Sequence, residues 1–125
     1  MSNAKAEKTA MDNEKVYAMS FAKIYPLLQQ KVERKGRTQA ELDAVIQWLT
    51  GYEAADLRSM ECEGIAYGDF FRQAPALNPR RKLIKGSICG IKVEAITEPF
   101  MQEIRYLDKL VDELAKGKPL EKIYR

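Results

Sequence analysis

The segment from Thr38 to Gly51 constrains the fold most, because it carries the start signal, the apolar stripe and the stop signal of one amphipathic helix. Thr38 and Glu41 have the spacing of a capping box, in which each side chain accepts a hydrogen bond from the other residue's amide. The apolar residues at i, i+3, i+4 and i+7 are Leu42, Val45, Ile46 and Leu49. Gly51 is placed to end the helix in a left-handed conformation. The chain is therefore expected to build its core from helices with one buried face.

A second long helix is predicted from Glu98 to Gly117. Glu98 stands near the positive N-terminal end of the helix dipole and Lys116 near the negative C-terminal end. Its apolar stripe consists of Phe100, Ile104, Leu107, Val111 and Leu114. Met101 and Leu110 widen the apolar face, which predicts a central place in the core.

Shorter helices are predicted before and between these two. One runs from a cap at Ser20 to Gly36, and Pro26 either kinks it or delays its start until about Tyr25. Further helices are expected over 53–60 and 67–73. Asn78 as cap and Pro79 at the first helical position then start another.

The periodicity of residues 83–96 fits two structures. Ile84, Ile88, Ile91 and Ala95 suit a helix, whereas Cys89, Ile91, Val93 and Ala95 alternate with polar or small residues as in an edge strand. Gly86 and Gly90 disfavour a helix by about 1 kcal/mol each. We favour the helix, with an irregular or strand-like piece near 88–95 as the alternative.

With 125 residues the chain has the length of one domain. Residues 1–15 are polar and are predicted to form a flexible N-terminal arm, and residues 16–125 a single compact domain. The fold class is mainly α, with about five to six helices. The tail after Gly117 holds Leu120, Ile123 and Tyr124, which pack either on the body or on a second subunit. If the tail packs on a second subunit, the protein is expected to be a homo-oligomer that associates through the C-terminal helix and tail.

Composition narrows the chemistry and the compartment. The chain contains no histidine, which excludes Ser-His-Asp, Cys-His and His-zinc sites. The presence of only two cysteines and the lack of an apolar leader predict that the protein works in a reducing cytoplasm. No stretch is apolar and long enough to span a membrane, so no association with a membrane is predicted.

Charge is unevenly distributed although the net charge is only +3. Residues 70–92 carry six basic residues and no acidic one, directly after an acidic block over 53–69. The helix start at Pro79 beside the basic residues could hold a phosphate or a nucleic acid, with an aromatic pocket next to it. The candidate ligand- or anion-binding residues are Arg80, Arg81, Lys82, Lys85, Tyr67 and Asn78. We favour the alternative that the two blocks pair or only solvate the surface.

Two other groups are considered and set aside. Cys89 has no histidine to act as its base, so a structural role is expected. Asp108, Asp112 and Glu113 supply too few carboxylates for a metal and have basic neighbours with which to pair. No catalytic residue, metal ligand or cofactor is predicted.

Several blocks of the sequence together resemble one bacterial family. They are Trp48-Leu49-Thr50-Gly51-Tyr52, Asp69-Phe70-Phe71 with Ala74-Pro75, Leu77-Asn78-Pro79, Leu83-Ile84-Lys85-Gly86 with Cys89-Gly90, Met101 to Leu110, and Asp112 to Gly117. In order and spacing they are similar to the family named "domain of unknown function 2200", from about Val16 to Arg125. The resemblance implies a single domain of orthogonally packed helices. It implies no activity, substrate or catalytic residue.

The leading hypothesis is therefore a small non-enzymatic cytoplasmic domain that binds a ligand or a partner. One alternative is weak binding of nucleic acid or phosphate ligands through residues 80–92. The other is an enzyme without histidine that uses Tyr, Lys or carboxylates.

Overall fold

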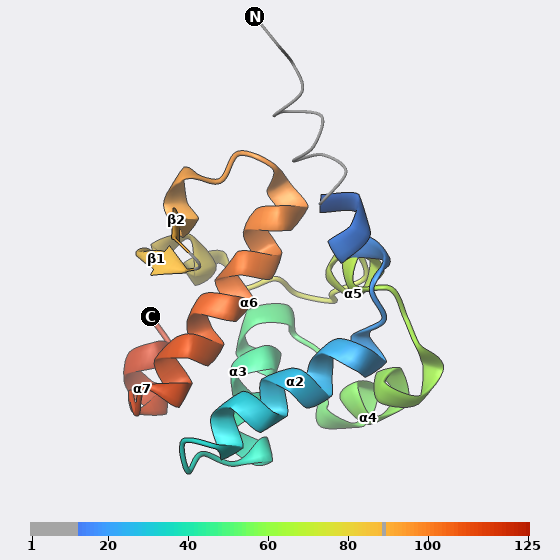
Figure 1. Cartoon of the computed structure of the whole chain (residues 1–125), viewed down its shortest axis with the longest axis horizontal. Helices are drawn as coiled ribbons and strands as arrows, with labels where there is room; N and C mark the ends of the chain where they lie inside the picture. The colour runs from blue at the N-terminus through green and yellow to red at the C-terminus, as the bar shows by residue number, and fades with distance from the viewer. Residues whose placement is uncertain (1–12, 89) are drawn as a thin grey trace, which may run out of the picture.

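The computed structural model describes residues 13–88 and 90–125, which are mainly helical and include one small antiparallel sheet (Figure 1). The predicted N-terminal arm lies outside the described residues up to residue 12. Its last three residues belong to a helix over 13–18, so helix begins before the boundary expected at residue 15.

Helix α2 spans Phe21–Glu33 and runs through Pro26. The side chain of Ser20 caps it by accepting from the Ala22 amide at 3.1 Å. The prediction of a helix capped by Ser20 is confirmed, and the alternative start near Tyr25 is wrong, because the cap and the first turn form ahead of the proline.

Helix α3 spans Gln39–Thr50 with the capping box of Thr38 and Glu41 in place, as predicted. Gly51 ends it at φ 81°. The segment over 73–78, between two later helices, passes this end of α3, where the Ala76 amide donates to the Thr50 carbonyl at 3.0 Å.

Helices α4, Ala54–Glu63, and α5, Tyr67–Arg72, confirm the two short predicted helices, although α4 extends three residues beyond Met60, to the residue before Gly64. Phe70 lies at the centre of an aromatic cluster, with ring centroids 4.4 Å from Phe21 and 4.8 Å from Tyr52. The Tyr52 hydroxyl also donates to the Phe70 carbonyl at 2.6 Å. These contacts join α2, α5 and the loop after α3 into one core.

The favoured helix over 83–96 is wrong. A 3-10 helix, η1, covers Pro79–Leu83, and a hairpin follows with β1 at Ser87–Ile88 and β2 at Ile91–Lys92. A second short 3-10 helix, η2, spans Val93–Ala95. Gly86 and Gly90 have φ of 115° and 78°, which a helix cannot use, so the glycines set the turn. The strand-like alternative near 88–95 is confirmed at Ile88, Ile91 and Lys92, which belong to the two strands. Cys89 lies outside the described residues.

Helix α6, Pro99–Ala115, is the central element, as its wide apolar face predicted. It packs against α2, α3, α5, β1 and η2, with the hairpin near its first half and α7, Leu120–Ile123, beyond its end (Figure 1). The tail folds back on its own chain. Ile123 is fully buried, and the Tyr124 ring stacks on Trp48 with centroids 5.9 Å apart.

Candidate functional site

The structure does not bring the predicted basic residues together into one site, because Arg81 forms an ion pair within the chain. Its Nε donates to both carboxylate oxygens of Glu103, at 2.9 and 2.8 Å, and its Nη1 donates to the Asn78 carbonyl at 3.0 Å. Only 16% of the Arg81 side chain and 8% of the Glu103 side chain are exposed. This pair fastens η1 to α6 and leaves Arg81 little capacity for a ligand.

Asn78 and Arg80 also make contacts within the chain. The Asn78 side chain accepts from the Arg80 amide at 2.9 Å and so caps η1, as predicted. The Arg80 Nη1 donates to the carbonyl of Arg125 at 3.0 Å. η1 is only five residues long, so its amides do not by themselves make an anion site.

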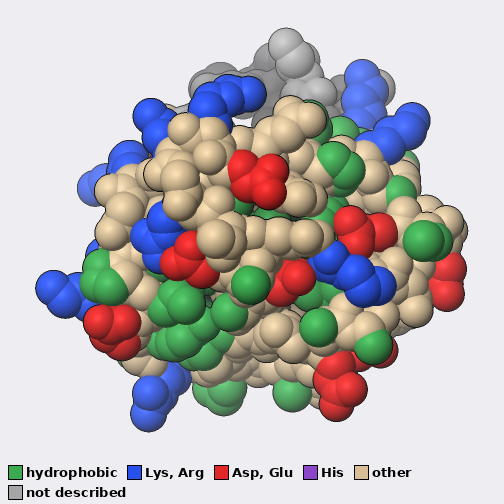
Figure 2. All heavy atoms as spheres, turned by 90° about the horizontal axis from the view of Figure 1, so that it is seen from below, with side chains coloured by type: hydrophobic (Ala, Val, Ile, Leu, Met, Phe, Trp, Pro, Cys, Tyr) green, Lys and Arg blue, Asp and Glu red, His purple; other side chains and the backbone are tan. Residues whose placement is uncertain are grey.

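Lys82, Lys85 and Lys92 remain exposed around the hairpin. Lys85 and Lys92 lie close to an acid, Glu94, whose carboxylate accepts from the Gly86 amide at 3.1 Å. That hydrogen bond lowers the pKa of Glu94, and so do its own backbone amide, Lys92 and Lys85. The face turned to the viewer in Figure 2 likewise mixes acidic, basic and hydrophobic side chains.

Tyr67 is not part of this basic surface. It lies on α5 with 2% of its surface exposed, and its hydroxyl has no hydrogen-bond partner within the described residues. Burial raises the pKa of Tyr67 well above its ordinary value, Asp108 adds to the rise and Arg105 opposes it. The hydroxyl therefore lies near the α6 pair of Arg105 and Asp108.

A cleft of about 450 Å³ opens beside the first half of α6. Four segments contribute to its wall: the helix over 13–18, β2, the chain that follows β2, and α6. The lining residues are Asn13, Ile91, Ala95, Ile96, Thr97, Glu98, Met101 and Arg105.

Helical periodicity explains why α6 contributes one whole side of this cleft. Glu98, Met101 and Arg105 stand at i, i+3 and i+7, so their side chains share one face of the helix. Ile91 and Ile96 reach the cleft from the hairpin and the loop after it, because the turn at Gly90 brings β2 back along β1. The wall is thus mostly apolar, with a carboxylate and a guanidinium on the helix side.

Glu98 is held in place by two donors. Its Oε2 accepts from the Met101 amide at 2.7 Å, which caps α6, and from the Tyr17 hydroxyl. The free amides at the start of a helix stabilise a carboxylate there.

Arg105 lies at the other end of the same face. Its Nη1 donates to Asp108 Oδ2 at 2.8 Å, and each of the two side chains is 24% exposed. Burial raises the pKa of Asp108 although Arg105 acts in the opposite direction. The pair therefore lies where water is partly excluded.

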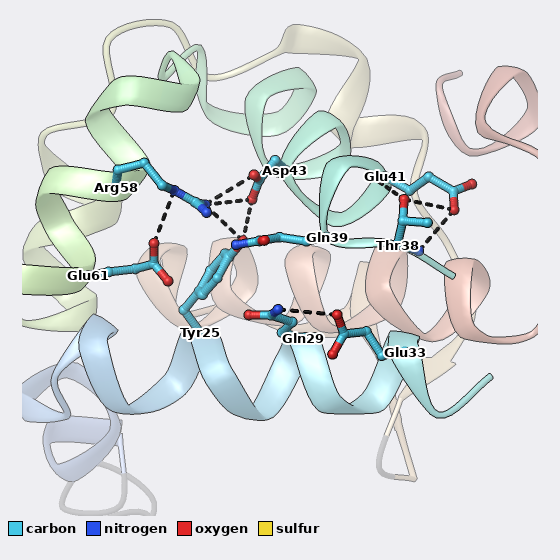
Figure 3. A network of polar contacts seen from close by, with 9 residues as sticks. All are labelled: Tyr25, Gln29, Glu33, Thr38, Gln39, Glu41, Asp43, Arg58 and Glu61. Carbon is cyan, nitrogen blue, oxygen red and sulfur yellow. Dashed lines mark hydrogen bonds and ion pairs between the residues drawn. The ribbon is translucent and has the colours of Figure 1, made fainter. Parts of the chain in front are cut away.

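A second polar cluster joins α2, α3 and α4 around Tyr25 (Figure 3). The Tyr25 hydroxyl donates to Asp43 at 2.5 Å and accepts from Arg58 at 2.9 Å and from Gln39 at 3.1 Å. Arg58 also donates to both Asp43 oxygens, and its Nε forms an ion pair with Glu61 at 3.0 Å without hydrogen-bond geometry. Burial and the bond to Asp43 raise the pKa of Tyr25 to about 12. We interpret this cluster as a structural link between helices.

The acids of the second half of α6 form ion pairs with basic side chains. Asp112 lies 3.0 Å from Lys116 and 3.6 Å from Lys31, and Glu113 accepts from Arg125 at 2.6 Å. In the part of the chain that the structure describes, no three acidic or cysteine side chains converge as a metal site would need.

Sequence reasoning missed the cleft. The sequence indicates Glu98 as a helix-start residue and Met101 as part of the apolar face, but Arg105 stands out only as one of the basic neighbours of the α6 acids. The seven-residue spacing of Glu98 and Arg105 can be read from the sequence. The opposite wall of the cleft depends on the hairpin, and the periodicity of residues 83–96 does not decide between a helix and a strand there.

Comparison with known proteins places the chain in a family. The bacterial family described as "Uncharacterized protein conserved in bacteria (DUF2200)" matches residues 15–125, so the chain belongs to it. The resemblance seen in the sequence is thereby confirmed. No curated protein matches.

A solved structure shares the fold. The chain is 51% identical to the protein of "Crystal structure of uncharacterized protein SP1917", with a TM-score of 0.84, over 88% of this chain and 90% of that one. Separately, none of the described helices is both long and apolar enough to cross a membrane.

Proposed function

We propose that this protein is a non-enzymatic cytoplasmic domain that binds a small molecule in the cleft beside α6. The single observation that supports it is the combination of about 450 Å³ of space, apolar walls and two charged groups. Small-molecule sites are typically clefts of about 300 to 1,000 Å³ with mainly apolar linings and few polar groups. The exposed thiol of Cys62 is consistent with a reducing compartment.

The properties of the tyrosines argue against a tyrosine base in the enzyme alternative. A tyrosine base needs a lowered pKa to work near neutral pH, whereas burial raises the pKa of Tyr25 and Tyr52 to about 12. In addition, Tyr25 is hydrogen-bonded on all sides to residues that join helices.

The proposal is tested by screening fragment-sized molecules in protein NMR, with the backbone amides as reporters. Binders are expected to shift the amides of Ile96, Thr97 and Met101, which surround the cleft. Replacing Ile91 by Trp should fill the cleft and abolish these shifts, and because Ile91 is 48% exposed the fold should tolerate the change.

Leu27→Trp is the matched control, since Leu27 is a similarly exposed apolar residue, 59% accessible, on α2. It should leave binding unchanged. A screen in which shifts occur only away from these amides, or survive Ile91→Trp, would reject the cleft as the binding site.

A second candidate function is weak binding of polyanions at the hairpin. It is favoured by the exposure of Lys82, Lys85 and Lys92, whereas Arg80 and Arg81 are engaged within the chain. It predicts retardation of a DNA or RNA oligonucleotide at low salt. Each lysine replaced by Gln should reduce the slope of log K against log salt by roughly one unit. A wild-type protein that retards neither oligonucleotide at low salt would exclude it.

A further inference from the structure

We infer that the molecule bound in the cleft is an organic anion with an apolar body, and that the Arg105 guanidinium binds its carboxylate. This inference rests on the proposed function and names the chemical class of its ligand. It follows from the hydrogen bonds that Arg105 and Glu98 already make in the wall of the cleft, and from the positions of the apolar side chains.

Arg105 keeps donors for a ligand. A guanidinium has five N–H groups in a planar fork that matches a carboxylate. Within the described residues, Asp108 is the hydrogen-bond partner of the Arg105 side chain, through Nη1 alone. The remaining donors of the fork stay available where the side chain borders the cleft.

Asp108 is a positioning residue for that guanidinium. It stands one helical turn after Arg105, and its 2.8 Å hydrogen bond restricts where the guanidinium lies. Asp108 and Arg105 both act on the pKa of the buried Tyr67 hydroxyl, which has no hydrogen-bond partner within the described residues, and burial raises the pKa of Asp108 itself, so the pair borders the core. Charge-assisted hydrogen bonds are stronger where water is partly excluded.

Glu98 is a weaker site for a cation than Arg105 is for an anion. Its Oε2 already accepts from the Met101 amide and the Tyr17 hydroxyl, and the start of α6 offsets its charge. Arg105 is also the one cationic side chain among the cleft residues that the structure describes. An anion is therefore favoured over a cation.

The apolar walls determine the rest of the ligand. Met101 stands between Glu98 and Arg105 on α6, and Ile91 and Ile96 line the cleft from the hairpin side. A ligand whose charged group meets Arg105 would bury its remaining surface against these three side chains. Burial of this apolar surface adds to the affinity.

The experiment compares three probes with one apolar body: 4-phenylbutyrate, 4-phenylbutan-1-ol and 4-phenylbutan-1-amine. Each is titrated into the protein with amide shifts at Ile96, Thr97 and Met101 as the readout. We expect the carboxylate to bind about tenfold tighter than the alcohol, as one charge-assisted contact provides, and the amine to bind more weakly than either.

Two charge variants locate the effect. Arg105→Gln should reduce the affinity for the carboxylate to that for the alcohol. Lys116→Gln removes a positive charge from the exposed far end of α6 and should change nothing. A thermal melt of each variant establishes that it is folded.

A second pair of variants leaves Arg105 untouched, in case its removal disturbs α6. Ile91→Lys and Ile91→Glu remove the same apolar contact but add opposite charges at the rim of the cleft. The lysine variant should bind 4-phenylbutyrate more tightly than the glutamate variant, with no such difference for the alcohol.

The outcomes separate this inference from the proposed function. Equal affinity for all three probes at the cleft overturns the anion class but leaves a binding cleft. Tightest binding of the amine assigns recognition to Glu98 and overturns the inference in the same way. If no probe shifts the cleft amides, the inference fails, and the fragment screen decides the proposed function separately.

Discussion

Arg81 and Glu103 form an ion pair that ties η1 to the first half of α6, with the arginine Nε within 2.9 Å of both carboxylate oxygens. The pair is mostly shielded from water, so each member depends on the other for its stabilisation.

Removing one member should therefore cost more than removing both. We expect Arg81→Met or Glu103→Leu alone to lower the free energy of unfolding by about 2 to 4 kcal/mol, because the remaining charge is left unpaired in a partly buried place. The double variant should recover a large part of that loss. Urea denaturation of the four proteins measures the coupling, and simple additivity of the single losses would contradict it.

Gly51 and Gly36 provide a matched pair for the effect of a close backbone approach. Both have left-handed φ, 81° and 82°, so replacement by Ala costs each about 1 to 2 kcal/mol in conformation. A Cβ at Gly51 would also lie 2.9 Å from the Ala76 amide nitrogen, while one at Gly36 meets nothing within 4 Å. We expect Gly51→Ala to destabilise the protein by at least about 1 kcal/mol more than Gly36→Ala. Equal losses in urea denaturation would show that the loop at Ala76 gives way.

Buried tyrosines should make stability fall at alkaline pH. Burial raises the pKa of Tyr25 and Tyr52 to about 12, from 10.0 for a free tyrosine. The folded state therefore keeps protons that the unfolded state releases above pH 10. This contribution is complete below about pH 10 and is lost as the pH rises through about 12. Absorbance at 295 nm should accordingly show less tyrosinate in the folded than in the denatured protein at pH 11.

Tyr25→Phe separates that effect from other alkaline titrations. The variant is less stable at pH 8, because Asp43 and Arg58 lose a partner. Its urea midpoint should nevertheless fall less steeply than that of the wild type between pH 10 and 12. Parallel curves would mean that Tyr25 titrates normally in the folded protein.

Much of the helical structure follows from local signals. Thr38 with Glu41, and the glycine at position 51, determine the ends of α3 through contacts within a few residues, so they could be identified from the sequence. The same holds for Asn78 before Pro79. The strand-like structure near 88–95 stays only the alternative at the level of sequence, because the apolar residues of 83–96 fit both a helix and an edge strand. The deciding factor is the packing of β1 and η2 against α6, which is not local.

The candidate site shows the same division. The basic residues of 80–92 are conspicuous in the sequence, but whether a given arginine is available depends on distant partners. Glu103 occupies Arg81, and the carbonyl of Arg125 occupies Arg80. Arg105 has no special local signal, and only the fold brings the hairpin opposite it to form a cleft.

The stack of Tyr124 on Trp48 makes the position of the tail measurable. Trp48 is the one tryptophan of the chain, so its fluorescence reports this contact without interference. Tyr124→Ala should expose the indole, shift its emission to longer wavelength and destabilise the protein by about 1 to 3 kcal/mol, because a stacked aromatic ring is lost. Glu121→Ala, at an exposed position of the same tail, should change neither emission nor stability. The shift in Tyr124→Ala should also be independent of protein concentration, because the tail packs on its own chain. A wild-type emission maximum that moves to longer wavelength on dilution would instead assign this contact to a second subunit.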